Sequence, residues 1–142
     1  MKALIDSDVL LDVALRRSPW ARHSNAVLRL CQHRALTGLV SWHSLANVFY
    51  LIEHQGGADG RSFIAPLLRF VEVAAVGHED MELALRLEMA DLEDAMQVAA
   101  AVACGADRII TRNTKDFAGS AIPAITPAEF LARFAVQPGE GK

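Results

Sequence analysis

DLEDAMQVAAAVACGADRIITRNTKDF, residues 91–117, predicts a helix, a strand and a polar turn in succession. The helix begins with acidic residues, continues through alanines and ends at Gly105. A short strand at 108–111 follows, and the polar turn comes directly after it. In an open parallel sheet, ligands bind beyond the carboxyl ends of the strands. The polar residues that follow Ile109 and Ile110 are therefore candidates for chemistry.

Residues 3–5 form the only other predicted strand that ends in the same way, because it runs directly into Asp6, Ser7 and Asp8. If the two strands are neighbours in the sheet, carboxylates from distant parts of the chain meet at one edge. We therefore expect one pocket to contain Asp6, Asp8, Asp94 and Asp116.

Strands and helices alternate along the whole chain. Apolar periodicity predicts strands at about 2–6, 36–40, 71–76, 108–111 and 124–125, and helices at about 9–15, 20–33, 42–54, 61–70, 79–90, 91–104 and 127–134. This alternation predicts an α/β fold with a mainly parallel sheet and right-handed crossovers. We expect residues 1–135 to form a single domain and residues 136–142 to form a flexible C-terminal tail.

Composition favours a compact cytoplasmic protein. Of the 142 residues, 52% are hydrophobic, yet no apolar run reaches the roughly 20 residues that cross a bilayer. The opening MKALIDSD meets charge too early for a signal peptide, so we expect no membrane association. Cys31 and Cys104 both lie in apolar helical patterns and are expected to be reduced packing residues. A net charge of −3 means that nucleic-acid binding would need a local basic patch.

The acidic residues after the first strand have a structural and a functional interpretation. Ser7 or Asp8 is a suitable cap for the first turn of the following helix. A carboxylate at Asp6, directly after Ala-Leu-Ile, is expected at the sheet edge with little water around it, which favours a functional role. Asp12 lies one helical turn beyond Asp8 and is expected to be a structural acceptor.

Asp91 and Asp94 have the spacing of a capping box, and Asp91 is the expected helix cap. Capping explains Asp94 less well, because Asp94 shares a helix face with Gln97, away from the apolar stripe that includes Val102. The turn with Thr111, Asn113 and Asp116 would mean little alone, because Asn and Asp are common in turns.

Together these clusters predict a metal site. Two carboxylates about 5 Å apart repel by roughly 3 kcal/mol at an effective dielectric of about 20, so gathering several of them favours a bound cation. Oxygen ligands without Cys or His favour Mg²⁺ or Mn²⁺. Such an ion in a shallow cleft suits phosphodiester cleavage, because it activates water and stabilises the leaving oxygen.

The sequence resembles the PIN-domain ribonucleases, and within them the VapC-type toxins of bacterial toxin–antitoxin pairs. The resemblance covers nearly the whole chain. It is carried by ALIDSDVLLD at 3–12, VSWHSLANVFYLIE at 40–53 and LEDAMQVAAAVACGADRIITRNTKDF at 92–117. It implies a three-layer α/β/α fold, divalent-metal-dependent endonuclease activity on RNA, a homodimer and inhibition by a cognate antitoxin.

Carried over residue by residue, the resemblance makes Asp6 the first metal ligand and Asp94 the third acid. Asp8 stands where the family usually has Asn, and Thr111 is the polar residue that closes the site. The chain departs from the family pattern at two positions. The second acid, usually Glu on the third helix, falls on Asn47, and the residue after the Thr-Arg pair, often Asp, is Asn113.

The leading hypothesis is a metal-dependent endoribonuclease that acts as a toxin. Its residues fall into three groups: Asp6, Asp94 and Asp116 as metal ligands with Asn47 and Asn113 as neutral ligands or water holders; Asp8, Asp91 and Thr111 as supporting residues; and Arg112 and Lys115 as contacts to RNA phosphates. Arg16, Arg17 and Arg61 are further phosphate contacts if the fold brings them near.

Two other hypotheses remain open. In the first, the chain is a degenerate PIN-like module that binds RNA or an antitoxin and cleaves poorly, because the acidic quartet is short. In the second, Asp6-Ser7-Asp8-Val9 is the nucleophile motif of a haloacid-dehalogenase-like phosphatase, with an aspartyl-phosphate on Asp6. The chain is short for that fold, and Asp94 would have no role in it.

Overall fold

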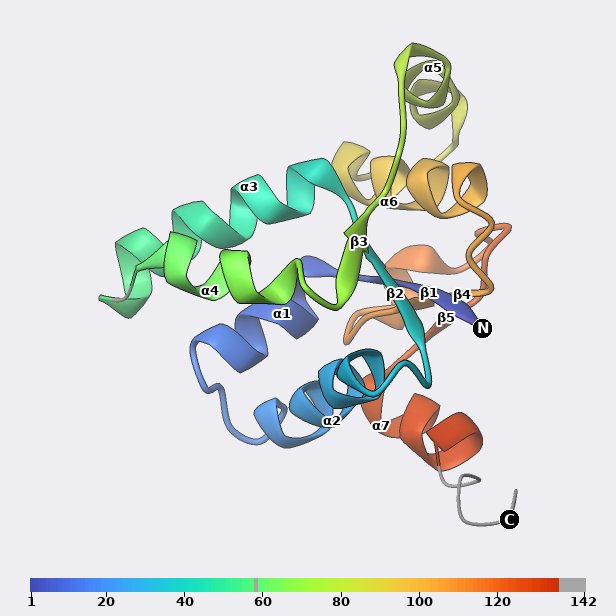
Figure 1. Cartoon of the computed structure of the whole chain (residues 1–142). Helices are drawn as coiled ribbons and strands as arrows, with labels where there is room; N and C mark the ends of the chain where they lie inside the picture. The colour runs from blue at the N-terminus through green and yellow to red at the C-terminus, as the bar shows by residue number, and fades with distance from the viewer. Residues whose placement is uncertain (58, 136–142) are drawn as a thin grey trace.

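One sheet of five parallel strands forms the centre of the protein (Figure 1). The computed structural model describes residues 1–57 and 59–135, so the predicted tail at 136–142 lies outside the described residues. The strands are β1 (Lys2–Ile5), β2 (Thr37–Val40), β3 (Val71–Val73), β4 (Arg108–Ile110) and β5 (Ala124–Ile125). Their order is β3-β2-β1-β4-β5, which makes β1 and β4 neighbours and meets the condition for the predicted gathering of acidic residues at one edge.

Seven α-helices connect or follow the strands in the described part of the chain. They are α1 (Ser7–Ala14), α2 (Ala21–Gln32), α3 (Trp42–Leu51), α4 (Gly60–Leu67), α5 (His78–Arg86), α6 (Leu92–Ala103) and α7 (Pro127–Phe130). Single π-helical turns extend α3 to Gly56 and α7 to Ala135, and a 3₁₀ turn covers Thr114–Phe117. None of the described helices is both long and apolar enough to cross a bilayer.

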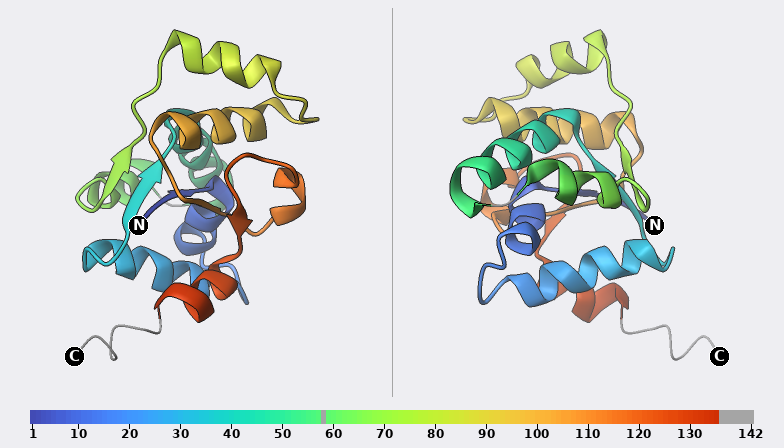
Figure 2. Two further views of the ribbon diagram at one scale, coloured as in Figure 1. Left: turned by 90° about the vertical axis from the view of Figure 1, so that its right-hand side faces the viewer. Right: turned by 60° about the vertical axis from the view of Figure 1, so that its left-hand side comes forward.

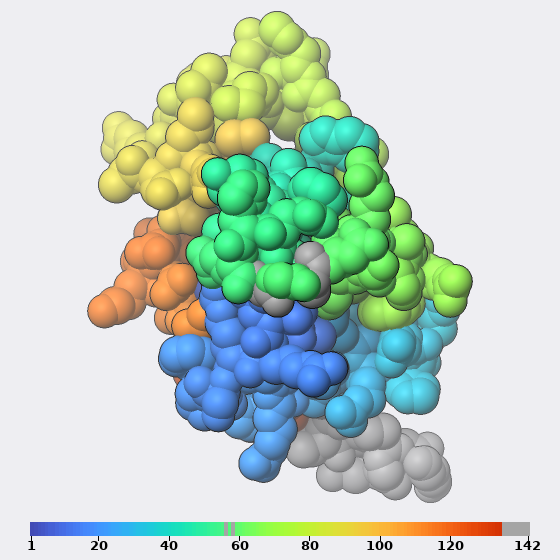
Figure 3. Space-filling model, turned by 90° about the vertical axis from the view of Figure 1, so that its left-hand side faces the viewer, coloured from blue at the N-terminus to red at the C-terminus, as the bar shows by residue number. Residues whose placement is uncertain are grey.

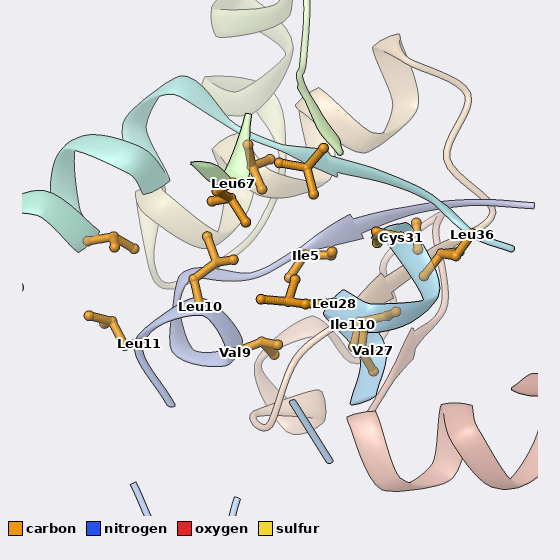
Figure 4. Close-up of a cluster of buried hydrophobic side chains, with 14 of the residues drawn as sticks. Ile5, Val9, Leu10, Leu11, Val27, Leu28, Cys31, Leu36, Leu67 and Ile110 are labelled. Atoms are coloured by element: carbon orange, nitrogen blue, oxygen red, sulfur yellow. The ribbon is translucent and has the colours of Figure 1, made fainter. Parts of the chain in front are cut away.

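The helices lie on both faces of the sheet, which confirms the three-layer α/β/α prediction. Ala3 and Ile5 of β1 point into a core formed with α1, α2, α4 and α7, and Figure 4 shows Ile5 there beside Val9 and Ile110. Leu4 points to the opposite face, where α6 packs. This alternation follows from the two-residue side-chain period of a strand, with both faces buried.

Helix contacts outside the sheet complete the layers. Figure 2 shows α2 and α7 side by side, and Figure 3 shows α3 and α4 together on the face that lies over α1. α5 packs on α6 rather than on the sheet (Figure 1), through Ala84 against Ala95 and Ala99. Small residues at this contact allow the two helices to approach closely.

The structure differs from the sequence prediction at several element boundaries. β3 ends at Val73 rather than near residue 76, and α5 ends at Arg86, because Leu87 has an extended backbone. Val102 was predicted in the core stripe of its helix, but it is 43% exposed. α6 faces the sheet through Val98 and Ala101 and faces α5 through Ala95 and Ala99, which leaves Val102 outside both contacts.

Both cysteines are free, as predicted. Cys31 is buried in the core on the α2 side, and this burial raises the pKa of its thiol to about 12. Cys104 packs against the core on the α6 side. Neither thiol lies among the acidic residues after β1 and β4.

Candidate active site

The parallel pairing of β1 with β4 brings the two predicted clusters to one sheet edge. Ile5 is in register with Ile110, and the backbone N–H of Asp6 donates to the carbonyl of Ile110 at 2.9 Å. The backbone N–H of Thr111 donates in turn to Ile125 on β5 at 3.0 Å. Asp6 and Thr111 therefore follow adjacent strands at the same carboxyl edge.

Asp6 lies at the centre of this edge and is only 8% exposed. Its Oδ1 accepts from Gln97 Nε2 at 2.8 Å and from the backbone N–H of Ser7 at 2.8 Å, and its Oδ2 accepts from Thr111 Oγ1 at 2.8 Å. The predicted helix cap, Ser7 or Asp8, is wrong, because Asp6 itself caps α1. One carboxylate thus begins the helix and occupies the predicted metal-ligand position.

Asp8 lies beside Asp6 and shares Thr111 with it. Its Oδ2 accepts from Thr111 Oγ1 at 3.2 Å, from the backbone N–H of Arg112 at 3.1 Å and from Asn113 Nδ2 at 3.0 Å. Its Oδ1 is buried without a hydrogen-bond partner in the described residues. Burial, together with the negative charge of Asp6, raises the pKa of Asp8 to about 7.

Asp94 approaches the same edge from the first turn of α6. Partial burial, and then the negative charges of Asp91, Asp6, Asp116 and Glu93, raise its pKa to about 6. Asp91 caps α6 as predicted, since its Oδ1 accepts from the backbone N–H of Asp94 at 3.1 Å. The negative charges of Asp6 and Asp116 therefore repel that of Asp94.

Asp116 and Lys115 are exposed on the 3₁₀ turn after β4, which the buried Phe117 fixes to the core. The charge of Asp116 is one of those that raise the pKa of Asp94, so this turn faces the start of α6. Asn113 is exposed as well, and its amide donates to Asp8.

Arg112 makes contacts within the protein that the sequence did not indicate. Its Nε donates to Asp12 Oδ2 at 2.8 Å, its Nη2 donates to Asp12 Oδ1 at 3.2 Å, and its Cζ lies 4.0 Å from the centroid of the Trp20 ring. Asp12 is fully buried and is the structural acceptor that the sequence predicts. Contact between Arg112 and RNA phosphate stays a prediction, and it would compete with this ion pair.

Sequence reasoning did not assign a role to Gln97 or Glu93. Gln97 is buried and donates to both Asp6 Oδ1 and Ser44 Oγ, at 2.8 and 2.9 Å. Asn47 Nδ2 lies 3.3 Å from each carboxylate oxygen of Glu93. The available signal for Gln97 was its position three residues after Asp94, on the same helix face. Asn47, which replaces an expected acid, is thus next to an acid from another helix.

The carboxylate oxygens of Asp6 and Asp94 are of the type that Mg²⁺ and Mn²⁺ prefer. Within residues 1–57 and 59–135, no group of three or more His, Cys, Asp or Glu side chains is arranged to hold a metal ion. Mg²⁺ keeps several water ligands and is commonly held by one or two carboxylates together with substrate phosphates. Asp6 and Asp94 supply such oxygens, and a cation would offset the repulsion that raises the pKa of Asp94.

Replacing Asp8 by Asn is expected to stabilise the metal-free protein at pH 8 and to stabilise it less at pH 5. The pKa of Asp8 is raised on folding, so its contribution is most favourable below pH 4 and is lost as pH rises through about 7. Asn retains an acceptor for the three donors and removes the charge. The expected gain at pH 8 is about 2 kcal/mol, measured by urea unfolding in EDTA at both pH values. Equal effects at the two pH values would contradict this explanation.

Comparison with known proteins agrees with this geometry. The model of the PIN domain family matches residues 2–115. No curated protein sequence matches the chain significantly.

Solved structures that resemble this one include the following three. VapBC2 from Rickettsia felis, bound to a DNA fragment from its promoter, has a TM-score of 0.67 at 14% identity and covers 89% of this chain and 98% of its own. A toxin–antitoxin complex from Klebsiella pneumoniae has a TM-score of 0.64 at 28% identity, covering 88% and 97%. VapC20 from Mycobacterium tuberculosis, a sarcin-ricin loop cleaving toxin, has a TM-score of 0.64 at 16% identity, covering 84% and 96%.

These matches agree with the predicted resemblance to PIN domains and VapC-type toxins. They leave the haloacid-dehalogenase alternative without support. The family match spans β1, the acidic start of α6 and the first two residues of the 3₁₀ turn after β4, so it includes Asp6, Asp8 and Asp94 but not Asp116. The chain belongs to the PIN domain family.

Proposed function

We propose that the protein is a divalent-metal-dependent endoribonuclease and the toxin of a toxin–antitoxin pair. The observation that carries the proposal is the raised pKa of Asp94 at the start of α6, which follows from its partial burial and from the negative charges of Asp91, Asp6 and Asp116. Family membership and the toxin neighbours support the coarser function, a nuclease of a toxin–antitoxin system.

In this proposal, Asp6 and Asp94 bind Mg²⁺ or Mn²⁺. Asp116 either binds the ion as a further ligand or contributes negative charge near it. The ion would activate water and stabilise the leaving oxygen of the phosphodiester. Gln97 and Thr111 fix the orientation of the Asp6 carboxylate through their 2.8 Å hydrogen bonds.

The polar residues around these ligands have supporting roles in the proposal. Asn47 and Asn113 hold water or act as neutral ligands, and each already contacts a carboxylate, Glu93 or Asp8. Lys115 is exposed on the turn after β4, where its ammonium group can meet an RNA phosphate.

The proposed partners are an RNA substrate, a cognate antitoxin protein and a second copy of this chain in a homodimer. The neighbours include toxin–antitoxin complexes, which supports an antitoxin as partner. Native mass spectrometry of the purified protein would measure whether it forms a dimer at micromolar concentration.

RNA cleavage with defined metals tests the proposal. Purified protein is incubated with a mixed pool of end-labelled single-stranded RNAs in Mg²⁺, in Mn²⁺ or in EDTA. Cleavage with either metal and none in EDTA is the expected result. No cleavage by protein whose circular dichroism shows an intact fold would contradict it.

The second candidate is a PIN module that binds RNA or an antitoxin without efficient cleavage. It is favoured by Asn47, which stands where the resemblance places an acid, and by the lack of a three-ligand group in the described residues. Calorimetry with Mn²⁺ separates the two candidates, because absence of binding up to millimolar metal would favour this second one.

A further inference from the structure

A cavity lies near the carboxyl edge of the sheet, and its lining contains none of the carboxylates described above. It has a volume of about 280 Å³, and Trp20, His23, Arg112, Thr126 and Pro127 form most of its lining. Arg112 follows Thr111 at the end of β4, and Thr126 follows β5. β4 and β5 follow β1 in the order of the sheet, so Arg112 and Thr126 come after strands close to the one that ends at Asp6.

Trp20 gives this cavity a rigid aromatic surface. The guanidinium of Arg112 lies over the indole at 4.0 Å and is itself fixed by two hydrogen bonds to the buried Asp12. Trp20 nevertheless remains 43% exposed to solvent. An exposed indole whose orientation is fixed loses little conformational entropy when it binds a flat ligand, and aromatic or guanidinium planes are the usual stacking partners of unpaired bases.

Polar groups and charge around the cavity also suit a nucleotide. Thr126 Oγ1 accepts from the backbone N–H of Glu129 at 3.1 Å, which keeps its hydroxyl proton for another acceptor. His23 is exposed at the lining, and its ring nitrogens can donate or accept. Arg112 and Arg17 both pair with the single carboxylate of Asp12, so this group of three side chains carries a net positive charge. Such a charge attracts the phosphates on either side of a bound base.

We propose that this cavity is a subsite for one unstacked nucleobase of a single-stranded RNA, which stacks on the face of the Trp20 indole that Arg112 leaves uncovered. The inference rests on the proposed function, because it takes RNA as the substrate. It adds a specificity element that the family match does not assign, and its binding step needs no metal.

The two tryptophans of the chain allow a direct test. In Trp42→Phe, Trp20 is the only tryptophan, and its fluorescence reports on the cavity alone. We expect saturable quenching when a four-nucleotide single-stranded RNA is added in EDTA. The matched variant Trp20→Phe, in which only Trp42 emits, should show no such change. Equal quenching in the two variants, or none in either, would overturn the subsite.

Ribose 5-phosphate separates base stacking from phosphate binding on Arg112. It lacks a base and is expected to leave Trp20 fluorescence unchanged, and equal quenching by this compound would overturn the proposal. N-acetyl-phenylalaninamide tests the alternative of a protein partner. If it displaces the RNA from Trp20 at similar concentration, the cavity is a protein docking site and the proposal is wrong.

The contribution of stacking is measured with fluorescently labelled RNA by anisotropy, again in EDTA. Trp20→Ala is expected to weaken binding about 5- to 150-fold, the range for loss of one stacked base, and Trp20→Phe should recover most of it. Equal weakening by Ala and Phe would contradict stacking. Cleavage in Mg²⁺ is measured separately. Quenching of Trp20 without cleavage would reject the proposed nuclease activity and support the subsite. Cleavage without quenching would support the nuclease activity and reject the subsite.

Discussion

Replacing Asp94 by Asn is expected to lower RNA cleavage about 100-fold or more while the fold remains intact. The substitution removes a metal-ligand charge, and each tenfold loss of rate corresponds to about 1.4 kcal/mol of transition-state stabilisation. The folded protein should tolerate the change, because the charges of Asp91, Asp6 and Asp116 already disfavour ionised Asp94. Single-turnover cleavage in Mg²⁺ measures the effect. Glu72→Gln, which removes one exposed negative charge on the edge strand β3, is the matched control.

The same carboxylate predicts how metal binding depends on pH. Protonated Asp94 cannot ligate a cation, so Mn²⁺ affinity should fall as pH drops through about 6, the pKa of Asp94 in the metal-free protein. Calorimetry of the wild type between pH 5 and pH 8 would show this decrease. Full activity of Asp94→Asn, or metal affinity that is independent of pH and of this substitution, would reject Asp94 as a ligand.

Replacing Asp12 by Ala is expected to destabilise the protein by about 2–4 kcal/mol, the largest loss of stability that we predict. Asp12 is fully buried and accepts from Arg112 twice and from Ser24 Oγ at 3.3 Å. Removal of this carboxylate leaves a guanidinium unpaired with only 21% of its side chain exposed. Urea unfolding measures the change as a lower midpoint at constant slope.

A double-mutant cycle separates this effect from loss of packing. Arg112→Met in the Asp12→Ala background removes the unpaired charge and retains most of the apolar volume, so the double variant should be more stable than Asp12→Ala alone. If the changes in unfolding free energy from the two substitutions are simply additive, the ion pair does not stabilise the fold. The loss in Asp12→Ala is then caused by altered packing around Asp12. The double variant would also remove the charged partner of the Trp20 ring, which Asp12→Ala alone retains.

Local sequence patterns predicted most of the fold. The alternation of apolar strands with amphipathic helices predicted the parallel sheet, and Gly105, which has a φ of 69°, ends α6 where the sequence indicates. The neighbouring positions of β1 and β4 were a condition of the predicted site and not a prediction from the sequence, and the sheet order meets that condition. These features depend on residues close together in sequence, or on the general rule that ligands bind at the carboxyl edge.

The remaining features depend on contacts between distant segments. Gln97 contacts Asp6 across 91 positions and Asn47 contacts Glu93 across 46, and neither pairing has a local sequence signal. The cap of α1 was misassigned by one or two residues, because Asp6, Ser7 and Asp8 follow each other and each can cap a helix. Arg112 was expected to face RNA, but a buried acid one turn along α1 holds its guanidinium.

In this all-parallel sheet, the residues proposed to act in function and the residues that only support the fold lie at opposite ends of the strands. Asp6, Ser41, Thr111 and Thr126 follow four different strands, and all lie at the carboxyl edge. The amino edge, where Lys2 and Arg108 begin β1 and β4, contains none of the proposed ligands. Natural variation at the amino edge should therefore alter melting temperature and leave RNA preference unchanged. Selection on the choice of target would act on a few short loops at the carboxyl edge, so substrate preference can diverge without a new fold.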